Sequence, residues 1–519
     1  MENSSTKRMA QSTLALIVFA LVGKVFGFAR ESLMAYYFGA GIEVDAFVAA
    51  QKSTALLSGI VSATIATILI PMLTKVELAE GAERKSYHTN NMLTLAVLAG
   101  AIMAGLGMLF APVLTKLIGG GFGKEQFDLT VELTRVGMPV IIFSAIVGVL
   151  TGFLQSEGKF AATGAIAIPL NVVYISYMVI LSDTFGIRGL TIASVLGILA
   201  QVIFLLPETI KCKFKYFFVF DIKDKFVINA LILSIPVLFS VAINDINVIV
   251  NTRFASGLAE GTVAVLSYAN KLNTLILGIF VSAITAVIFP VLSREFSSGR
   301  MDRGKAAMNG SVKFIVLITI PSMIGLMVLS QPIVEVAFLR GEFNHAAAEL
   351  TSSALRFYSL ALCAMSLNNL LNRVYYSLQD TKTPFIIGIL YVALNIGLNF
   401  ILVRFMGHNG LAFALSIAIN ISVITSFVLL HRKIGRIGIK GYIRTLIKSL
   451  IAAGIMGLVA NFTYFNLEAL LGNSTAIKLA CLLVTVAISV FVYGLICYVL
   501  GVKEVRMLVE FTKKKFNKN

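Results

Sequence analysis

Charged residues are scarce in this sequence. Only 13% of the 519 residues are charged and 58% are hydrophobic, with a mean hydropathy of +0.89, whereas a soluble domain carries about 25% charged residues. This scarcity excludes a soluble globular protein. Apolar runs of about 20 residues recur along the chain, and each is long enough to cross a hydrocarbon core about 30 Å thick. We therefore expect a protein that lies in the membrane along its whole length.

The apolar runs also lack the alternation with period two that a transmembrane β-barrel requires. Because backbone polar groups in lipid must be paired within the structure, helices are the remaining way to span the bilayer. The sequence therefore predicts an all-α polytopic membrane protein. We expect fourteen transmembrane helices, at approximately 10–35, 45–74, 91–115, 133–155, 161–181, 189–207, 227–250, 262–292, 314–330, 351–375, 384–403, 410–430, 443–464 and 475–500.

Cysteine and catalytic motifs are scarce as well. The four cysteines lie far apart and none forms a C-x-x-C pair, so we expect inert packing residues. No H-E-x-x-H, G-x-S-x-G or Walker sequence is present, and the four histidines fall in connections or at segment ends. We predict that the protein is not an enzyme and needs no cofactor. The residues concerned are Cys212, Cys363, Cys481, Cys497, His88, His345, His408 and His431.

The net charge of +17 is explained by topology. Alternate connections and both ends of the chain together hold 29 of the 43 basic residues. The positive-inside rule therefore places both termini in the cytoplasm, and the charge does not predict a nucleic-acid partner. The opposite connections hold only Lys116, Lys124, Arg188, Arg253, Arg340 and Arg404.

Two parts of the sequence resemble each other after a shift of 219 residues. Residues 52–75 match residues 271–294, so that the lysines and the prolines of the two stretches coincide. We predict two homologous six-helix lobes, at 1–215 and 216–434, followed by residues 435–519 with helices 13 and 14 and a basic tail. Parallel repeats of this kind occur in transporters that rock around a midplane site. A duplication kept only for stability is the alternative.

Eight basic residues lie inside apolar segments, and four of them, Arg135, Arg356, Arg373 and Lys478, lie near segment ends and can reach the interface. The other four are Lys24, Arg30, Lys52 and Lys271. Each would cost about 2.5 to 3.5 kcal/mol at the bilayer centre if it faced lipid, so we expect them to face an interior cavity. Since Lys52 and Lys271 are equivalent in the repeat, they should approach one space from opposite lobes, with water or an anion between them. The alternative is a buried ion pair between Lys52 and an acid such as Asp45.

Other polar residues in the apolar segments suggest further contacts. Lys271 belongs to a polar stripe with Ser267, Asn270 and Thr274, at the spacing of one helix face. The sequence Arg30-Glu31 is consistent with a local ion pair, and also with a guanidinium that binds a phosphate through two hydrogen bonds.

A candidate cation site is formed by oxygen-bearing residues of two segments. Asp245 and Asn247 lie together in the seventh segment, and Asn395 and Asn399 share a face of the eleventh. These oxygens would suit a small cation, while hydrogen bonds between helices are the alternative.

Several motifs resemble a known family. In the first lobe these are residues 23–31, 38–41 and 45–49, and in the second lobe 268–272, 340–343 and 373–384. The last of them, Arg373-Val374-Tyr375-Tyr376-Ser377-Leu378-Gln379-Asp380-Thr381-Lys382-Thr383-Pro384, is the most specific. The chain resembles the MurJ (MviN) lipid II flippases of bacteria, a branch of the multidrug/oligosaccharidyl-lipid/polysaccharide exporter superfamily.

The resemblance implies a function and a binding site. It implies a monomeric flippase of the bacterial cell membrane. Its substrate would be lipid II, the undecaprenyl-diphosphate-linked cell-wall precursor, moved from the inner to the outer leaflet by alternating access. The membrane potential or a gradient of Na+ or H+ would drive it. Lys24, Arg30 and Lys271 match positions of cavity cations that are usually arginines, and Asp45 matches the acid of the family's Asp-Ala-Phe motif.

Helices 13 and 14 match the pair that forms a lipid-facing groove for the polyprenyl tail. We expect Ala453 and Gly457 to lie on the face that meets the tail.

The sequence departs from the family at one place. Ser58-Gly59 and residues 63–66 stand where many members have an Arg-Arg pair and a Glu-Gly motif. An exporter of another lipid-linked oligosaccharide is therefore the alternative. A cationic-drug exporter is disfavoured because its cavity should be acidic, and a membrane glycosyl polymerase because the outer connections are short.

Overall fold

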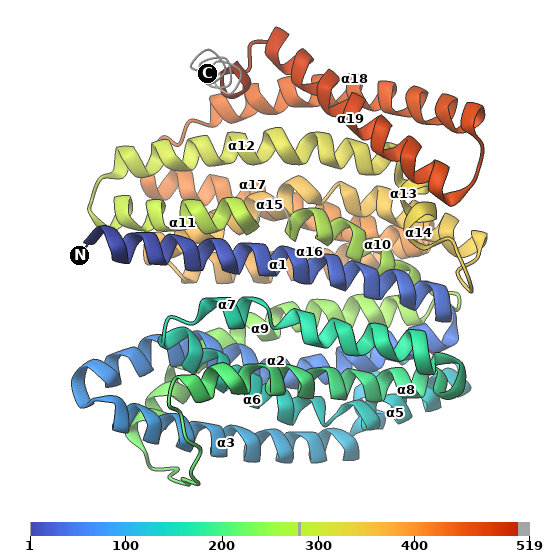
Figure 1. Ribbon diagram of the computed structural model, residues 1–519. Helices are drawn as coiled ribbons and strands as arrows, with labels where there is room; N and C mark the ends of the chain where they lie inside the picture. Colours follow the sequence, from blue (N-terminus) through green and yellow to red (C-terminus); the bar gives the residue numbers. More distant parts are fainter. Residues whose placement is uncertain (1, 279–281, 507–519) are drawn as a thin grey trace. The chain divides into compact units, whose positions relative to one another are not determined.

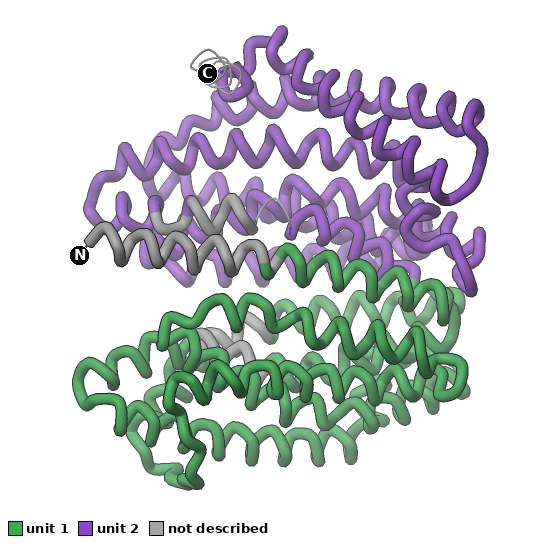
Figure 2. Tube along the Cα trace, viewed as in Figure 1, with its two compact units in different colours: residues 1–264 green, residues 265–519 purple. Residues whose placement is uncertain are grey.

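In a computed structural model that describes residues 2–278 and 282–506, the chain is built of helices and the connections between them (Figure 1). The helices are long because the sequence offers long apolar runs, and in lipid a backbone that pairs all its polar groups within the segment is helical. The chain divides into two compact units, Met1–Ala264 and Val265–Asn519 (Figure 2).

The first unit contains the helices up to the start of α10. They are α1 (Glu2–Phe38), α2 (Ile42–Glu80), α3 (Ala82–Leu109), α4 (Ala111–Gly119), α5 (Lys124–Gly137), α6 (Val140–Ser156), α7 (Phe160–Gly164), α8 (Ala167–Lys211) and α9 (Lys225–Ser256).

The second unit contains the remaining helices. They are α10 (Thr262–Ile276), α11 (Ser282–Ser297), α12 (Met301–Val328), α13 (Ser330–Phe338), α14 (His345–Ser359), α15 (Leu362–Ser377), α16 (Lys382–Met406), α17 (His408–Ile434), α18 (Ile439–Leu471) and α19 (Thr475–Val499).

The all-helical membrane fold is confirmed. Among the described residues, seven helices are long and apolar enough to cross a bilayer, and nine if two bent pairs are each one span. The bent pairs are α5 with α6, at 41°, and α14 with α15, at 46°. Gly186, with φ of 52°, divides α8 within the range that holds two predicted segments. The order of helices follows the predicted segments, and the full count of fourteen stays a prediction.

The first unit is organised around α2, which packs against α3, α5, α6 and α9. Its apolar core includes Leu69, Leu73, Met138, Ile141 and Val149, all buried. Because α9 packs on α2 and α4, this helix belongs to the first compact unit, although its sequence lies in the predicted second lobe. The compact units are defined by contacts within the structure, whereas the predicted lobes are defined by similarity in sequence. The division into two homologous lobes therefore stays a prediction.

In the second unit, α12 packs against α15 and α18, and α18 packs against α19. Ala453 and Gly457 are buried. Ala453 is 0% exposed in the core of the unit, so the expectation that it faces a lipid tail is wrong. A Cβ atom at Gly457 would lie 2.8 Å from Cγ2 of Ile324 on α12, yet Gly457 also lines a surface pocket together with Leu458, and for Gly457 the expectation stays a prediction. The outward apolar face of α18 instead includes Leu458 and Phe462, which are exposed.

The cysteines agree with a packing role. Cys363, Cys481 and Cys497 are buried, Cys212 is half-buried, and none of the four forms a disulfide.

Candidate functional site

The first helix approaches α8 closely where it carries its cations. Gly23 is buried, and a Cβ atom there would lie 3.0 Å from Cβ of Ala167. The side chain of Asn171 donates to the carbonyl of Gly23 at 3.4 Å. The absence of a side chain at Gly23 therefore permits this approach. Lys24, one residue later, is half-buried.

Arg30 lies in a polar cluster between α1 and α8. Its guanidinium donates to Glu31 at 2.7 Å and lies 5.0 Å from the ring centroid of Tyr174. The hydroxyl of Tyr174 accepts from Gln51 of α2 at 2.9 Å. The local pair with Glu31 is thus present. Because a guanidinium has five N–H donors, this pair leaves capacity for a further anion.

Lys52 extends this polar cluster to α9. Its ammonium group donates to the hydroxyl of Thr252 at 3.0 Å, while the adjacent Gln51 contacts Tyr174. We call Arg30, Glu31, Lys52, Tyr174 and Thr252 together the polar belt.

Asp45 has a different environment, two helical turns before Lys52. It is 1% exposed. Its carboxylate accepts hydrogen bonds from the backbone N–H groups of Gly261 at 2.8 Å and Ala264 at 2.7 Å, and from the side chain of Gln126 at 3.2 Å. The carboxylate therefore joins the start of α2 to the turn before α10 and to the first turn of that helix, where N–H groups lack helical partners.

Lys271 lies in the second unit, on α10. It is exposed, while Ser267, Asn270 and Thr274 are half-buried, so the polar stripe occupies the accessible face of the helix. Tyr268, on an adjoining face of the helix, is buried and packs against other aromatic rings of the unit. The approach of Lys52 and Lys271 to one space stays a prediction.

The residues of the candidate cation site also fall in two units. In the first, the side chain of Asn251 donates to the carbonyl and side-chain oxygens of Asn247, both at 2.8 Å, and Asp245 is half-buried. In the second, Asn395 and Asn399 are fully buried, with Nδ2 of Asn399 3.4 Å from Oδ1 of Asn395. No cluster of three His, Cys, Asp or Glu residues suited to a metal occurs within the described part of the chain.

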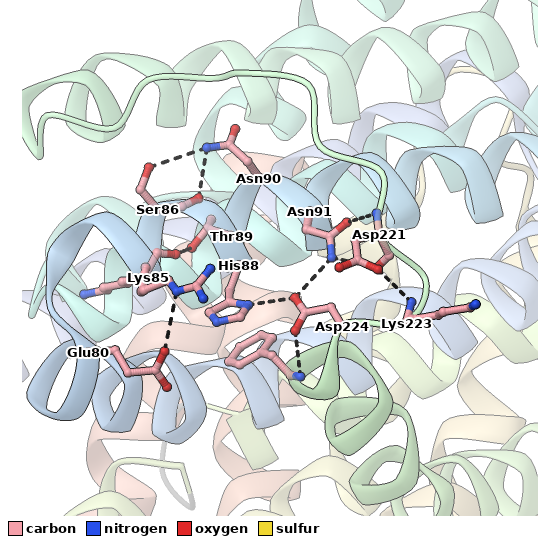
Figure 3. A network of polar contacts seen from close by, with 12 residues as sticks. Glu80, Lys85, Ser86, His88, Thr89, Asn90, Asn91, Asp221, Lys223 and Asp224 are labelled. Carbon is pink, nitrogen blue, oxygen red and sulfur yellow. Dashed lines mark hydrogen bonds and ion pairs between the residues drawn. The ribbon is translucent and has the colours of Figure 1, made fainter.

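A buried polar network at the start of α3 was not predicted from the sequence (Figure 3). His88 Nδ1 lies 2.7 Å from the carboxylate of Asp224, which caps α9 by accepting from the N–H of Phe226. Lys85, 2% exposed, pairs with Glu77 at 2.6 Å and also with Glu157. The available signal in the sequence was the run of consecutive polar residues from Lys85 to Asn91. Such a run supplies many hydrogen-bonding groups for buried partners, which a connection in solvent does not need.

A comparable ion pair occurs in the connection between α15 and α16. Asp380 pairs with Lys433 and accepts from Thr383. Burial alone would raise the pKa of Asp380, but the hydrogen bonds from Lys433 and Thr383 outweigh burial and lower it to about 2. Glu157, in the connection between α6 and α7, is also paired, with Lys85. These two connections therefore each contain a paired acid.

The sequence matches a known family over most of its length. The family model described as "Lipid II flippase MurJ" matches residues 34–500. The chain belongs to the MurJ family. A probable lipid II flippase MurJ of Vibrio cholerae is 32% identical over 83% of this chain and 84% of its own length. A probable lipid II flippase MurJ of Rhizobium tropici is 29% identical over 95% of each chain.

Solved structures support the same fold. A lipid II flippase MurJ in an inward closed conformation aligns with a TM-score of 0.78 and 23% identity, over 96% of this chain and all of its own. A MATE family transporter of the MOP superfamily in an inward-facing conformation aligns with a TM-score of 0.67 and 16% identity, over 81% and 98%. The fold is therefore that of a transporter, and the chain is a multi-pass membrane protein.

Proposed function

We propose that this protein is a lipid II flippase. It would move the undecaprenyl-diphosphate-linked precursor from the inner to the outer leaflet by alternating access. The match of the MurJ family model to residues 34–500 carries this proposal. The polar belt supports it, because Arg30 and Lys52 place positive charge among membrane-spanning helices, where a diphosphate headgroup needs it. Unaided, each unpaired polar group of the headgroup would cost several kcal/mol in hydrocarbon.

We assign Lys24, Arg30, Lys52 and Lys271 to substrate binding. Each supplies a cation that attracts the diphosphate, and Arg30 also offers a planar fork for phosphate oxygens. Asp45 takes a positioning role in this proposal, because its carboxylate is occupied by two backbone N–H groups and would repel a diphosphate. The membrane potential, or a gradient of Na+ or H+ acting at Asp245, Asn247, Asn395 and Asn399, would give the cycle direction.

We infer that both termini lie in the cytoplasm, since the basic connections share their side of the membrane. We also propose that the protein acts as a monomer. The tail of the substrate would lie along the outward apolar face of α18 and along α19, in the part of the chain outside the two lobes.

The test is replacement of the flippase in a bacterium depleted of its own. Growth together with lipid II accessible at the outer leaflet is the expected result. Failure to restore growth, with export of a different lipid-linked oligosaccharide, would favour the alternative raised by Ser58 and Gly59.

A further inference from the structure

A surface pocket of about 780 Å³ lies in the first unit, where the end of α2, the start of α3 and the start of α9 meet. Its lining divides into a charged part and an apolar part. The lining includes Met72, Lys75, Glu80, Arg84, Lys225 and Ile232.

The charged part of the pocket is positive once its internal pairs are considered. The carboxylate of Asp224 is occupied by His88 at 2.7 Å, by Asn91 at 3.2 Å and by the N–H of Phe226. Glu80 faces Arg84 at 3.8 Å. In the described part of the chain, the exposed Lys75 and Lys225 form no ion pair. The N-terminus of α9, a helix of 32 residues, adds positive potential beside Lys225.

The apolar part continues along the membrane-spanning lengths of the same helices. Ile232 and Leu233 of α9 are 58% and 54% exposed, and Met72 of α2 lines the same pocket. Lys75 and Lys225 come at the ends of the apolar segments, where headgroups begin. A ligand that fits both parts has an anionic group at the level of the lysines and hydrocarbon below it.

The wall that carries Lys225 is held in place before any ligand binds. Asn91 donates to the carbonyl of Asp221 at 2.8 Å and accepts from its N–H at 2.9 Å. Asn90 makes the same two-point contact with Lys215 and Phe217, at 3.1 Å each. Figure 3 shows these side chains on α3 facing the connection that leads into α9. A pocket wall fixed in this way loses little conformational entropy when the pocket binds a ligand.

We propose that this pocket binds the headgroup of an anionic diacyl phospholipid. The two lysines and the start of α9 would contact the phosphate, and the acyl chains would lie against Met72, Ile232 and Leu233. Only the identity of the leaflet, the cytoplasmic one, rests on the topology inferred above. A basic residue near a membrane surface contributes about 1 kcal/mol toward anionic lipid, so each lysine should give about a fivefold preference.

The chain contains no tryptophan, which allows a direct test. A single Ile232→Trp substitution places a fluorophore in the pocket of the full-length protein. The purified variant is reconstituted in mixtures of unlabelled lipid with brominated phosphatidylglycerol or brominated phosphatidylcholine, and bromine quenching reports which lipid occupies the pocket. We expect preferential quenching by brominated phosphatidylglycerol, reduced at least about fivefold when Lys75→Gln and Lys225→Gln are added.

Two controls isolate the pocket. Ile102→Trp lies on an exposed apolar part of α3 without charged neighbours in sequence, and it should show equal quenching by the two lipids. Lys382→Gln with Lys440→Gln removes two exposed lysines from the second unit, and it should leave the preference at Ile232→Trp unchanged.

Several outcomes would overturn the proposal. Equal quenching by both lipids at Ile232→Trp is one, and a preference that survives loss of Lys75 and Lys225 is another. Displacement of the brominated lipid by a small mole fraction of lipid II would assign the pocket to the transported substrate instead. Since the readout is lipid occupancy, a protein that failed to flip lipid II could still show the preference, so the two proposals fail separately.

Discussion

Lys52 and Lys271 occupy equivalent places in the sequence repeat but have different surroundings. Lys52 donates to Thr252 and adjoins a network that links side chains of several helices. Lys271 is exposed on the accessible face of α10. The repeat therefore preserves the charge and not its environment. The first unit places its cation between helices, while the second places its cation on an accessible helix face.

The largest expected effect concerns Lys24 and Lys271, two of the cations assigned to substrate binding. Lys24→Ala with Lys271→Ala should slow transport at least about 100-fold, because each hydrogen bond to a charged group contributes about 1.5 to 3 kcal/mol. Growth of a flippase-depleted strain that relies on the variant measures this. Lys440→Ala, which removes an exposed lysine elsewhere, should grow normally, and Lys24→Arg with Lys271→Arg should retain function. Normal growth of the variant with both alanine substitutions would contradict the substrate-binding role of Lys24 and Lys271.

The next effect concerns the acid that holds the turn before α10. Asp45→Asn should lower the free energy of unfolding by about 1.5 to 3 kcal/mol, since the ionised acceptor of two backbone N–H groups is lost. Denaturant unfolding in detergent measures this. Glu43→Gln is the matched control, because Glu43 is exposed in the same helical turn. Equal stability of the two variants would show that the Asp45 contacts contribute little.

How far the sequence predicted these features depends on their physical origin. Hydropathy predicted the helices, because each apolar run is long enough to span a bilayer. The spacing of Ser267, Asn270, Lys271 and Thr274 predicted a common face, which the structure confirms. The partners of Asp45 could not be predicted from the sequence. Two of them are backbone N–H groups more than 200 residues away along the chain, and such groups leave no signature in the sequence.

The two faces of α18 illustrate a second limit. Gly457 and Leu458 are adjacent in an apolar run, yet Gly457 packs on α12 and Leu458 is exposed. In lipid, a residue that faces a neighbouring helix and one that faces the bilayer are both apolar. Hydropathy therefore cannot separate them, and the expectation that Ala453 faces a lipid tail was wrong for that reason.

A smaller effect tests whether Lys52 is held as described. Thr252→Val removes the hydroxyl that accepts from Lys52 and should reduce transport by up to about tenfold, in line with about 0.5 to 1.5 kcal/mol for one hydrogen bond. Thr274→Val is the matched control near Lys271, because that hydroxyl donates to carbonyls of its own helix. Transport rates in proteoliposomes distinguish the two. Equal rates would mean that the two lysines do not differ in this respect.

The smallest effect concerns acid stability at Asp380. Its pKa in the folded protein is lowered to about 2, below the ordinary value of about 3.9 for an aspartate. Ionised Asp380 therefore stabilises the fold above pH 4, and this contribution is lost as the pH falls from about 4 to about 2. The difference in Tm between wild type and Asp380→Asn should close over that interval. A difference that stays constant down to pH 2 would contradict the role of the pair with Lys433.

The most direct test of the central claim is the accessibility of lipid II at the outer leaflet of cells in which this protein replaces the depleted flippase. With the wild-type chain, lipid II should become accessible at the outer surface. With Lys24→Ala and Lys271→Ala in a protein that still accumulates in the membrane, it should remain in the inner leaflet. Outer-leaflet lipid II at equal levels in both strains would contradict the account.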